Sequence, residues 1–262
     1  MKILCIGGDK RMLYAADFLS AERLFMGNFP EIQGKFGGIV LPMPLSKDKL
    51  SINAPLSQTA VTFNIILQYA EKSAVIFAGG TCDALEKLCR ENNFSLVNYF
   101  ASERLALKNA ALTAEAAVCL LSQNGDEALL GAEILVTGYG RIARFLARYL
   151  KTLGGKVTIA ARNPAARAAA ELEGFCAVDI NEISGGFDYC ANTVPAHILP
   201  EEFFSDIGAY MELATLDGER EKKLCSENGK KYISAGGLPG KFYPKTAGKF
   251  IAEEITQLID YR

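Results

Sequence analysis

The chain has 262 residues, of which half are hydrophobic, and a formal net charge of −2. This length suits two domains, and the apolar content supplies a sizeable core. The slight negative charge argues against a nucleic-acid partner, because binding to phosphates requires a basic face. No apolar run approaches a membrane span, and the opening MKILCIGGDK has no signal-peptide pattern. We therefore expect a cytoplasmic protein without membrane association.

The seven cysteines lie mostly within apolar segments, and their number is odd. This pattern indicates buried thiols in a reducing compartment and not a disulfide framework. His197 is the only histidine, and Cys82 and Cys89 have no zinc-ligand partners nearby in the sequence. We therefore predict no metal site.

Strands and helices alternate through the first hundred residues. Continuous apolar strands between amphipathic helices are typical of a parallel sheet covered on both faces, so we predict a small doubly wound domain over residues 1–112. A polar stretch at residues 46–53 is expected to be a surface loop. The expected strands are residues 1–8, 36–45, 73–80 and 94–100, and the expected helices are residues 10–24, 55–70 and 82–91.

A second α/β domain is predicted over residues 113–246. A helix over 102–111 should precede it, and the domain should begin with a linking helix over 113–123 that has Thr113 as its N-cap. Beyond residue 164, strands are expected near 174–178, 187–193, 209–213 and 231–234. A last helix, 247–260, is expected to return across the first domain. Because ligands of open α/β sheets bind at the carboxyl ends of strands, the chemistry should lie in a cleft between the two domains.

The stretch from Glu133 to Pro164 reads as strand, glycine turn, helix and second strand. Its turn matches the dinucleotide fingerprint G-x-G-x-x-A. Gly138 allows the tight turn, Gly140 lets a pyrophosphate approach the backbone, and the alanine lets the helix pack closely on the strand. The phosphates would lie at the helix N-terminus, beside Arg141 and Ile142, where free N–H groups favour an anion. We predict a Rossmann domain that binds a dinucleotide.

The end of the second strand of this unit bears on the choice of dinucleotide. NAD-binding proteins usually carry an acidic residue there, to bind the ribose 2′-OH. Here the sequence has Arg162 and Asn163 and no acid. Arg162 can pair with a 2′-phosphate, and Arg167 could assist, so we predict NADP in preference to NAD. Alternatively, Arg162 simply ends a strand at the surface.

The first of three loops expected at the cleft follows the opening strand. Gly7 and Gly8 would expose backbone N–H groups to an anion, and Arg11 could clamp a carboxylate. We therefore list Gly8, Asp9 and Arg11 as substrate-binding. The alternative is ordinary turn chemistry, with Asp9 as an N-cap and a solvated Arg11.

The second loop is the segment Asn192-Thr193-Val194-Pro195, at the end of a strand in the second domain. Such a segment commonly lies against the nicotinamide half of a dinucleotide, so Thr193, Val194 and Pro195 are predicted to contact the cofactor. His197, at the start of an expected helix, is more simply read as a surface residue than as a general base.

The third loop, residues 236–248, is dense in glycine and proline and precedes a helix. We assign Gly237, Leu238 and Pro239 to cofactor binding. Lys245 and Thr246 would point, with the helix N-terminus, at a carboxylate or a phosphate. The alternative is a loop without a ligand.

Taken in order, these motifs resemble those of the dipicolinate synthase A chain family along nearly the whole chain. The matching segments are the I-G-G-D-x-R start at residues 6–11, the glycine turn at 138–141, the A-R strand end at 161–162, N-T-x-P at 192–195, and the closing G-L-P-G and P-K-T-A-G at 237–240 and 244–248. The last pair is the most specific.

The resemblance implies a flavodoxin-like N-terminal domain and a function. Members of the family oxidise a dihydrodipicolinate to dipicolinate with NAD(P)⁺ during endospore formation, beside the flavoprotein-like B subunit of dipicolinate synthase. It therefore implies NADP or NAD as cofactor, a small dicarboxylate as substrate, that B subunit for a partner and the mother cell of a spore-forming bacterium as location. A homo-oligomer also stays open.

The chain departs from the family pattern in three places. It is short, with little room for a second strand between Leu24 and Phe36. The family's P-T-V-E-G is reduced to Thr113 and Glu115, and the arginine of A-S-R-P-G-G is replaced by Leu216. If that arginine holds a substrate carboxylate, the substrate can differ.

The oxidation of a dihydropyridine dicarboxylate requires groups that hold two carboxylates and one that takes a proton. Substrate-binding candidates are Gly8, Asp9, Arg11, Thr113 and Thr246, with Arg104 and Lys108 as weaker ones. The catalytic base is expected to be Lys245 or Glu115. Two alternatives stay open: an NADP-dependent oxidoreductase of another small carboxylate, and a non-catalytic NADP-binding subunit.

Overall fold

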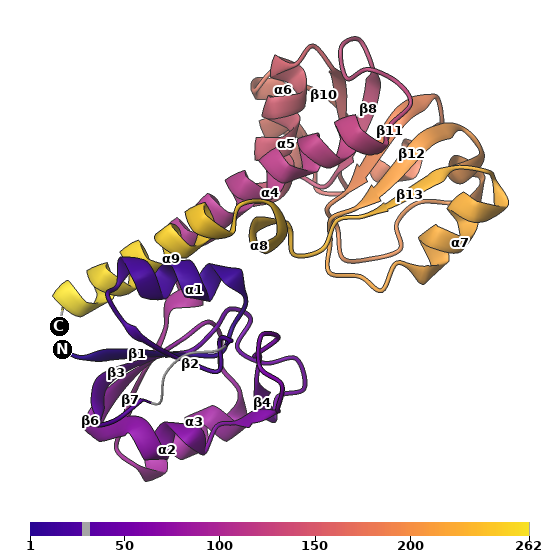
Figure 1. Ribbon diagram of the computed structural model, residues 1–262. Helices are drawn as coiled ribbons and strands as arrows, with labels where there is room; N and C mark the ends of the chain where they lie inside the picture. The colour runs from indigo at the N-terminus through magenta and orange to yellow at the C-terminus, as the bar shows by residue number, and fades with distance from the viewer. Residues whose placement is uncertain (28–31, 262) are drawn as a thin grey trace. The chain divides into compact units, whose positions relative to one another are not determined.

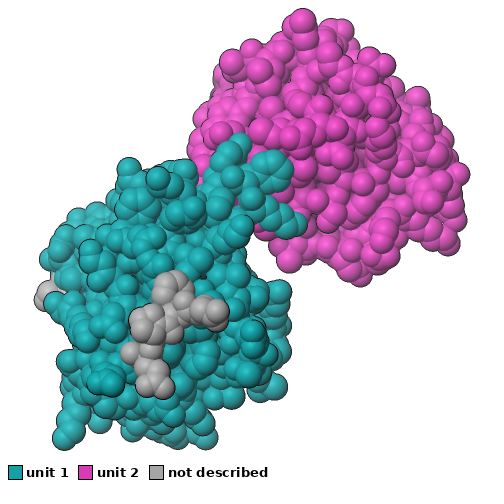
Figure 2. Space-filling view, viewed as in Figure 1, with its two compact units in different colours: residues 1–109, 240–262 teal, residues 110–239 magenta. Residues whose placement is uncertain are grey.

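The computed structural model describes residues 1–27 and 32–261. The chain forms two compact units (Figure 2). Unit 1 comprises residues 1–109 and 240–262, and unit 2 comprises residues 110–239. The last stretch of the chain therefore belongs to the same unit as the first.

Unit 1 is built on a five-stranded parallel sheet (Figure 1). The sheet order is β2-β1-β3-β6-β7, which is the flavodoxin-like order 2-1-3-4-5 once the strands β4 and β5 of a separate hairpin are left out of the count. The predicted α/β class and flavodoxin-like topology are thus confirmed for this unit. The strands are β1 (Ile3–Ile6), β2 (Glu22–Leu24), β3 (Phe36–Val40), β6 (Ala70–Ala78) and β7 (Ser95–Asn98).

Helices cover both faces of this sheet, because successive strand residues point to opposite sides. Leu4 and Ile6 pack with residues of α2 (Ile65–Tyr69) and α3 (Asp83–Glu91). Cys5 points the other way, into a core shared with α1 (Lys10–Phe18) and α9 (Pro244–Asp260). Figure 1 shows α2 and α3 on one side of the sheet and α1 with α9 on the other.

The contact between α1 and α9 depends on one glycine of the closing motif. A Cβ built on Gly248 would lie 2.5 Å from the carbonyl oxygen of Arg11 and 2.9 Å from the amide nitrogen of Ala15. Since real Cβ atoms do not approach this closely, glycine lets the two helix backbones touch. Ile251 and Ile255, one and two turns later, are fully buried in the same core.

Unit 2 carries a six-stranded parallel sheet in the order β10-β9-β8-β11-β12-β13. This is the Rossmann order, so the prediction of a second doubly wound fold is confirmed. The order reverses between β8 and β11, and their carboxyl ends form the topological switch point, where such folds bind ligands. The strands are β8 (Glu133–Thr137), β9 (Lys156–Ala160), β10 (Cys176–Val178), β11 (Phe187–Asn192), β12 (Ile207–Glu212) and β13 (Lys231–Ser234).

The helices that follow strands of unit 2 are α5 (Arg141–Thr152), α6 (Pro164–Leu172), α7 (Glu219–Glu227) and α8 (Leu238–Phe242). Of these, α5 contacts β8 and β9, and α7 covers the opposite face of the sheet together with the short helix η3 (Glu201–Ser205).

Three expected helices are wrong in their extent. The helix expected over 10–24 ends at Phe18, and its last residues form β2, since Ser20 adopts a left-handed conformation that breaks the helix. The second strand of the sheet thus ends at Leu24, and the described residues between Leu24 and Phe36 contain no further strand. The helix expected over 55–70 is reduced to α2, because a small hairpin of β4 (Ser51–Ile52) and β5 (Val61–Thr62) occupies the region. The helix expected to begin near His197 does not include this residue; the short helix η3 begins after it, at Glu201.

The two helices expected at 102–111 and 113–123 form one continuous helix, α4 (Glu103–Asn124). Thr113 is therefore in the helix interior and is not an N-cap. By length and composition α4 could cross a membrane, contrary to the expectation that no apolar run approaches a span. Buried helices of soluble proteins pass the same test, and several α4 side chains, among them Leu105, Ala117 and Leu121, are fully buried within the protein.

Candidate functional site

The fingerprint turn has the geometry that its sequence predicts. Gly138 has a φ of +79°, and a Cβ there would lie 2.9 Å from Val194 Cγ2 and 3.0 Å from Thr193 Oγ1. Its amide donates to the carbonyl of Ala160, the last residue of β9, at 2.8 Å. The first glycine is thus required both by its conformation and by the tight packing of the 192–195 segment against it.

The N-terminus of α5, which follows directly after the fingerprint turn, is open on the side of Gly140. Gly140 is the N-cap and makes no side-chain capping bond, and a Cβ built on it would meet no non-neighbouring atom of the described residues within 4 Å. Arg141 and Ile142 are the first residues of the helix. Ala143, the last fingerprint position, is fully buried and lets α5 approach the sheet. This cradle fits a pyrophosphate, as the fingerprint requires.

At the end of β9, the Arg162 side chain is exposed and has no ion-pair partner among the described residues. Asn163 is engaged as the N-cap of α6, where its Oδ1 accepts from the amide of Ala165 at 2.9 Å. Arg162 is the residue here that remains available to a 2′-phosphate.

Arg167, which the sequence suggested as an assistant to Arg162, is engaged in the loop through one nitrogen of its guanidinium. Its Nη1 donates to the carbonyls of Ala161 and Arg162, at 2.7 and 3.0 Å, and to Asp179 Oδ2 at 2.7 Å. Arg167 therefore holds the loop after β9 in place. It also neutralises Asp179, whose pKa is lowered by the backbone amide of Asn181 and by Arg167.

The Asn192–Pro195 segment is tied to the end of β8. Thr137 Oγ1 donates to Asn192 Oδ1 at 2.6 Å, and Thr193 Oγ1 donates to the Thr137 carbonyl at 2.6 Å. The Val194 amide also donates to Asn192 Oδ1, at 3.1 Å. This segment therefore lies at the switch point, directly beside the fingerprint turn.

A buried carboxylate supports this segment from the end of β12. Glu212 is 4% exposed and accepts from Asn192 Nδ2, the Tyr210 hydroxyl and the Ala214 amide. Burial raises the pKa of Glu212, and its hydrogen bonds only partly oppose this effect. Sequence reasoning missed Glu212. The signal was an acidic residue closing the apolar strand IGAYME.

The loop after β1 differs from the predicted anion-binding turn. The amides of Gly7 and Gly8 donate to the carbonyls of Leu24 and Asn53, at 2.9 and 2.8 Å, so they are not free for an anion. Asp9 is the N-cap of α1, as the alternative interpretation had it. Arg11 is not solvated.

The Arg11 guanidinium is held at the base of this loop. Its Nε and Nη2 donate to the Asp9 carboxylate, and Nη2 also donates to the Met43 carbonyl at 2.7 Å. Its side chain is 11% exposed. Nη1 has no hydrogen-bond partner among the described residues, so a carboxylate could still accept from it.

The closing loop contains a short helix, α8, which the sequence did not suggest. Leu238 and Pro239 are buried, whereas Gly237 is exposed with a φ of +68°. The two side chains are thus directed inward, and a cofactor could be contacted by the backbone. Lys245 and Thr246 lie exposed in the first turn of α9, because this helix begins at Pro244, three residues before its expected start at residue 247.

Glu115 and Thr113 lie in the middle of α4, so neither is at a helix N-terminus. Glu115 is exposed. Arg104 and Lys108, on the first turns of α4, are paired with α9: Arg104 Nε donates to Glu254 Oε2 at 3.0 Å, and Lys108 Nζ donates to a Glu253 oxygen at 2.6 Å.

His197 lies away from the fingerprint turn's contacts. Its Nδ1 is 2.8 Å from Glu221 Oε1, and its side chain is 42% exposed. Glu221, on α7, is almost fully buried. The interpretation of His197 as a partly exposed structural residue fits this pair better than a role as general base.

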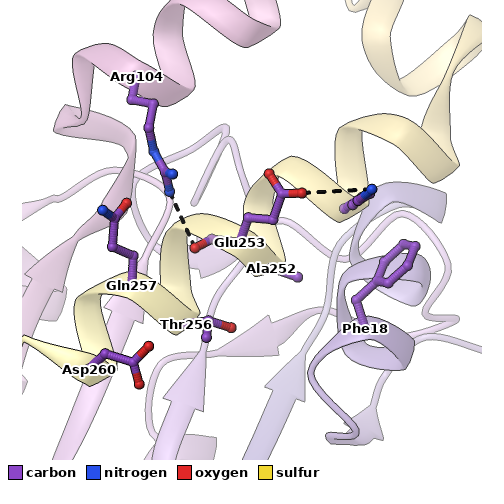
Figure 3. Close-up of a pocket in the computed structure, with 8 residues that line it drawn as sticks. Phe18, Arg104, Ala252, Glu253, Thr256, Gln257 and Asp260 are labelled. Atoms are coloured by element: carbon purple, nitrogen blue, oxygen red, sulfur yellow. Dashed lines mark hydrogen bonds and ion pairs between the residues drawn. The ribbon is translucent and has the colours of Figure 1, made fainter.

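A hollow of about 410 Å³ lies on the α9 face of unit 1 (Figure 3). Arg104, Lys249 and Glu253 line it, and they are paired among themselves or with neighbouring groups. Phe18 of α1 closes one side. None of the predicted cofactor or substrate residues lines it, apart from the weaker candidate Arg104.

Two parallel sheets in flavodoxin-like and Rossmann order, with an open glycine turn at the switch point of the second, define a dehydrogenase-like α/β protein. Known proteins place the chain more narrowly. Residues 28–100 match the family model of the N-terminal domain of the dipicolinate synthase A subunit. The chain is 27% identical to the dipicolinate synthase A subunit of Bacillus subtilis (strain 168), over 99% of this chain and 96% of that protein.

Comparison with solved structures points to the same family. The A chain of dipicolinate synthase from Bacillus subtilis matches with a TM-score of 0.81, covering all of this chain and 96% of that one. The corresponding A-subunit structure from Bacillus halodurans matches at 0.82 with 24% identity, covering 98% and 97%. A D-lactate dehydrogenase from Treponema pallidum shares the fold, at 0.60 and 12% identity, over 100% and 98% of the two chains. The resemblance to the dipicolinate synthase A chain family is therefore confirmed.

Proposed function

We propose that this chain oxidises a dihydrodipicolinate to dipicolinate with NADP⁺ as the preferred acceptor, as the A subunit of a dipicolinate synthase. The observation that carries the proposal is the open N-terminus of α5 behind Gly138 and Gly140, at the switch point of the Rossmann sheet. The relationship to the dipicolinate synthase A chain family supplies the substrate class.

NADP is proposed over NAD because of the charges at the end of β9. Arg162 is an exposed cation, and no acid stands in residues 160–164 to accept from a ribose 2′-OH. Asp179, a nearby acidic residue, is already paired with Arg167, whose Nη1 lies 2.7 Å from Asp179 Oδ2. A 2′-phosphate would find a cation at this edge, whereas a 2′-OH would find no free carboxylate among these residues.

The reaction removes one hydride and one proton from a six-membered dihydropyridine, which gives the aromatic dicarboxylate, NADPH and H⁺. The bound nicotinamide supplies the hydride acceptor. The protein binds, orients and takes the proton. Thr193 and Val194, which lie against Gly138, and the following Pro195 are proposed to fix the plane of the ring.

On the substrate side we propose Arg11 as a carboxylate clamp through its unpaired Nη1 edge, oriented by Asp9 and the Met43 carbonyl. Gly8 and Asp9 then shape the loop and do not donate to the substrate. Lys245 and Thr246, at the start of α9, are proposed for the second carboxylate. Lys245 and Glu115 remain the two candidates for the base, and Thr113 stays a candidate for substrate contact.

The direct test uses purified protein, enzymatically generated dihydrodipicolinate and NADP⁺ or NAD⁺, with and without a B subunit. We expect NADPH and dipicolinate to form together, in equal amounts. Absence of turnover under all four conditions, while the protein binds the dinucleotide, would contradict the proposed substrate.

A second candidate is an NADP-dependent oxidoreductase of another small carboxylate. Leu216, in place of the family's arginine in the loop after β12, favours it, because an apolar side chain cannot bind a carboxylate. A panel of imino and hydroxy acids assayed with NADP⁺ distinguishes the two. A Leu216→Arg variant that gains activity on dihydrodipicolinate would point to a lost carboxylate contact.

The partner we propose is a flavoprotein-like B subunit, and the proposed location is the mother-cell cytoplasm of a spore-forming bacterium, both from the family relationship. Co-purification of the two proteins, with this chain on its own as the comparison, tests the partnership. Binding of NADP without turnover of any acid, whether the B subunit is present or not, would instead support a non-catalytic NADP-binding subunit.

A further inference from the structure

We propose that Glu212 is a positioning residue for the dinucleotide, acting through the side-chain amide of Asn192 on the segment that packs against the fingerprint turn. The inference rests on the proposed function, since it concerns how the same site is held in shape. Glu212 and Asn192 close neighbouring strands, at paired positions in the register of β12 and β11.

The amide of Asn192 is oriented by its surroundings on both sides. Its Oδ1 accepts from Thr137 Oγ1 at 2.6 Å and from the Val194 amide at 3.1 Å. Its Nδ2 donates to the Val194 carbonyl at 3.0 Å and to both Glu212 oxygens, at 3.1 and 3.0 Å. Donors face the oxygen and acceptors face the nitrogen, so one orientation of the amide satisfies every group.

Glu212 supplies one of the two acceptors for the Asn192 nitrogen. Without it, a buried donor would lose a partner, because Asn192 is 1% exposed. The Asn192 amide bonds both the N–H and the carbonyl of Val194, and it therefore sets the shape of the 192–194 turn. That turn meets Gly138, where a Cβ would lie 2.9 Å from Val194 and 3.0 Å from Thr193.

Glu212 also begins the next loop. Its Oε1 accepts from the Ala214 amide at 2.9 Å, and its Oε2 accepts from the Tyr210 hydroxyl at 2.8 Å. One carboxylate thus fixes two loops that leave the carboxyl edge of the sheet. None of its hydrogen-bond partners among the described residues is a cation, so the carboxylate is costly to bury. A purely structural core would be better served by an apolar side chain at this position.

The test measures dissociation constants for NADP⁺ and NAD⁺ by calorimetry, with the melting temperature of each variant. We expect Glu212→Leu to weaken binding of both by about tenfold, as loss of one buried hydrogen bond would. In an Asn192→Ala background, the same change should have no further effect on the dissociation constant. An equal effect in both backgrounds, or wild-type affinity in Glu212→Leu, would overturn the proposal.

Asn192→Asp tests the same link with a nearly isosteric change, should Glu212→Leu fail to fold. It sets a carboxylate against Glu212, so binding should be weakened more at about pH 8 than at about pH 5.5, because a lower pH favours the sharing of one proton between the two carboxyl groups and so relieves their repulsion. An equal loss at both would overturn the proposal. Glu221→Gln, which alters a buried acid without contact to Asn192, is the matched control and should bind normally. If the wild type bound neither dinucleotide, the proposed function itself would fail.

Discussion

The carboxylate of Asp9 holds the guanidinium of Arg11 through two atoms, with Oδ1 3.0 Å from Nε and Oδ2 2.8 Å from Nη2. The same carboxylate caps α1 by accepting from the Arg11 amide at 2.9 Å. Gly240, of the closing motif, packs on the pair, since a Cβ there would lie 3.0 Å from Arg11 Nε and 3.1 Å from Asp9 Oδ2. The closing motif, which is distant in sequence, thus packs on an ion pair of the opening motif.

Arg11→Gln should raise the KM for the dicarboxylate at least tenfold while the dissociation constant for NADP⁺ stays within about twofold, because Arg11 lies in unit 1 and the fingerprint in unit 2. It should also lower the free energy of unfolding by about 2 kcal/mol, through the lost bonds to Asp9 and Met43. Steady-state kinetics and urea denaturation measure the two effects. Arg90→Gln, an exposed arginine on α3, is the control. An unchanged KM would remove Arg11 from substrate binding.

Gly248→Ala should destabilise unit 1 by about 1–3 kcal/mol, because the new methyl group would meet the backbone of α1. Urea denaturation of the variant measures this loss. Thr246→Ala, an exposed residue in the first turn of α9, should leave the free energy of unfolding within about 0.5 kcal/mol of wild type. Wild-type stability in Gly248→Ala would mean that the two helices can separate without cost.

Arg162→Ala should weaken NADP⁺ binding by about ten- to a hundredfold and change NAD⁺ binding by less than about threefold, since only NADP⁺ carries the 2′-phosphate. Calorimetric titration with both nucleotides gives the ratio. Arg148→Ala, on α5 and paired with Glu173, is the control for loss of an exposed arginine in the same unit. Equal loss of both nucleotides would exclude Arg162 from phosphate recognition.

The stability of the protein should depend on pH through Glu212. Burial raises the pKa of this carboxyl above its ordinary value of 4.5, so the folded state prefers the protonated form. The stabilisation is complete below pH 4.5 and is lost as the pH rises through the folded-state pKa. In Glu212→Gln this fall in the free energy of unfolding should be absent. Urea denaturation at a series of pH values measures it.

Glu173 provides the comparison of opposite sign. Its partial burial alone would raise the pKa, but hydrogen bonds from Arg144 and Arg148 outweigh burial and lower the pKa to about 2. The stabilisation from Glu173 is therefore present above pH 4.5 and lost as the pH falls towards 2. If Glu173→Gln and Glu212→Gln changed the pH profile in the same direction, the assignment of the two environments would be wrong.

The fingerprint was predictable because its requirements are local. A glycine with positive φ, an open helix N-terminus and a small residue facing the strand are all fixed within six residues, and the structure has each of them. The Rossmann order was predictable because the strands after it alternate with helical stretches. The N-cap Asp9 was open to sequence reasoning as one of two alternatives, for the same local reason.

Features that depend on distant partners were not predictable. The amides of Gly7 and Gly8 are satisfied by Leu24 and Asn53, and nothing in the G-G-D sequence shows that these carbonyls come near. Thr113 is a good N-cap by type, yet helical residues on both sides keep it in the interior of α4. The role of Glu212 depends on its hydrogen bond with Asn192, twenty residues earlier, and the sequence of one strand cannot show that the two residues are paired.

Unit 1 is made of two separate stretches of the chain, and this has a consequence for how the protein folds during synthesis. Residues 110–239 form a contiguous body, whereas the N-terminal body needs residues 240–262 to complete its interior. On the ribosome, Met12 and Ala15 of α1 remain without their packing partners on α9 until Ile251 and Ile255 have been translated. The part made later can therefore finish folding first, against the usual N-to-C order of multidomain proteins.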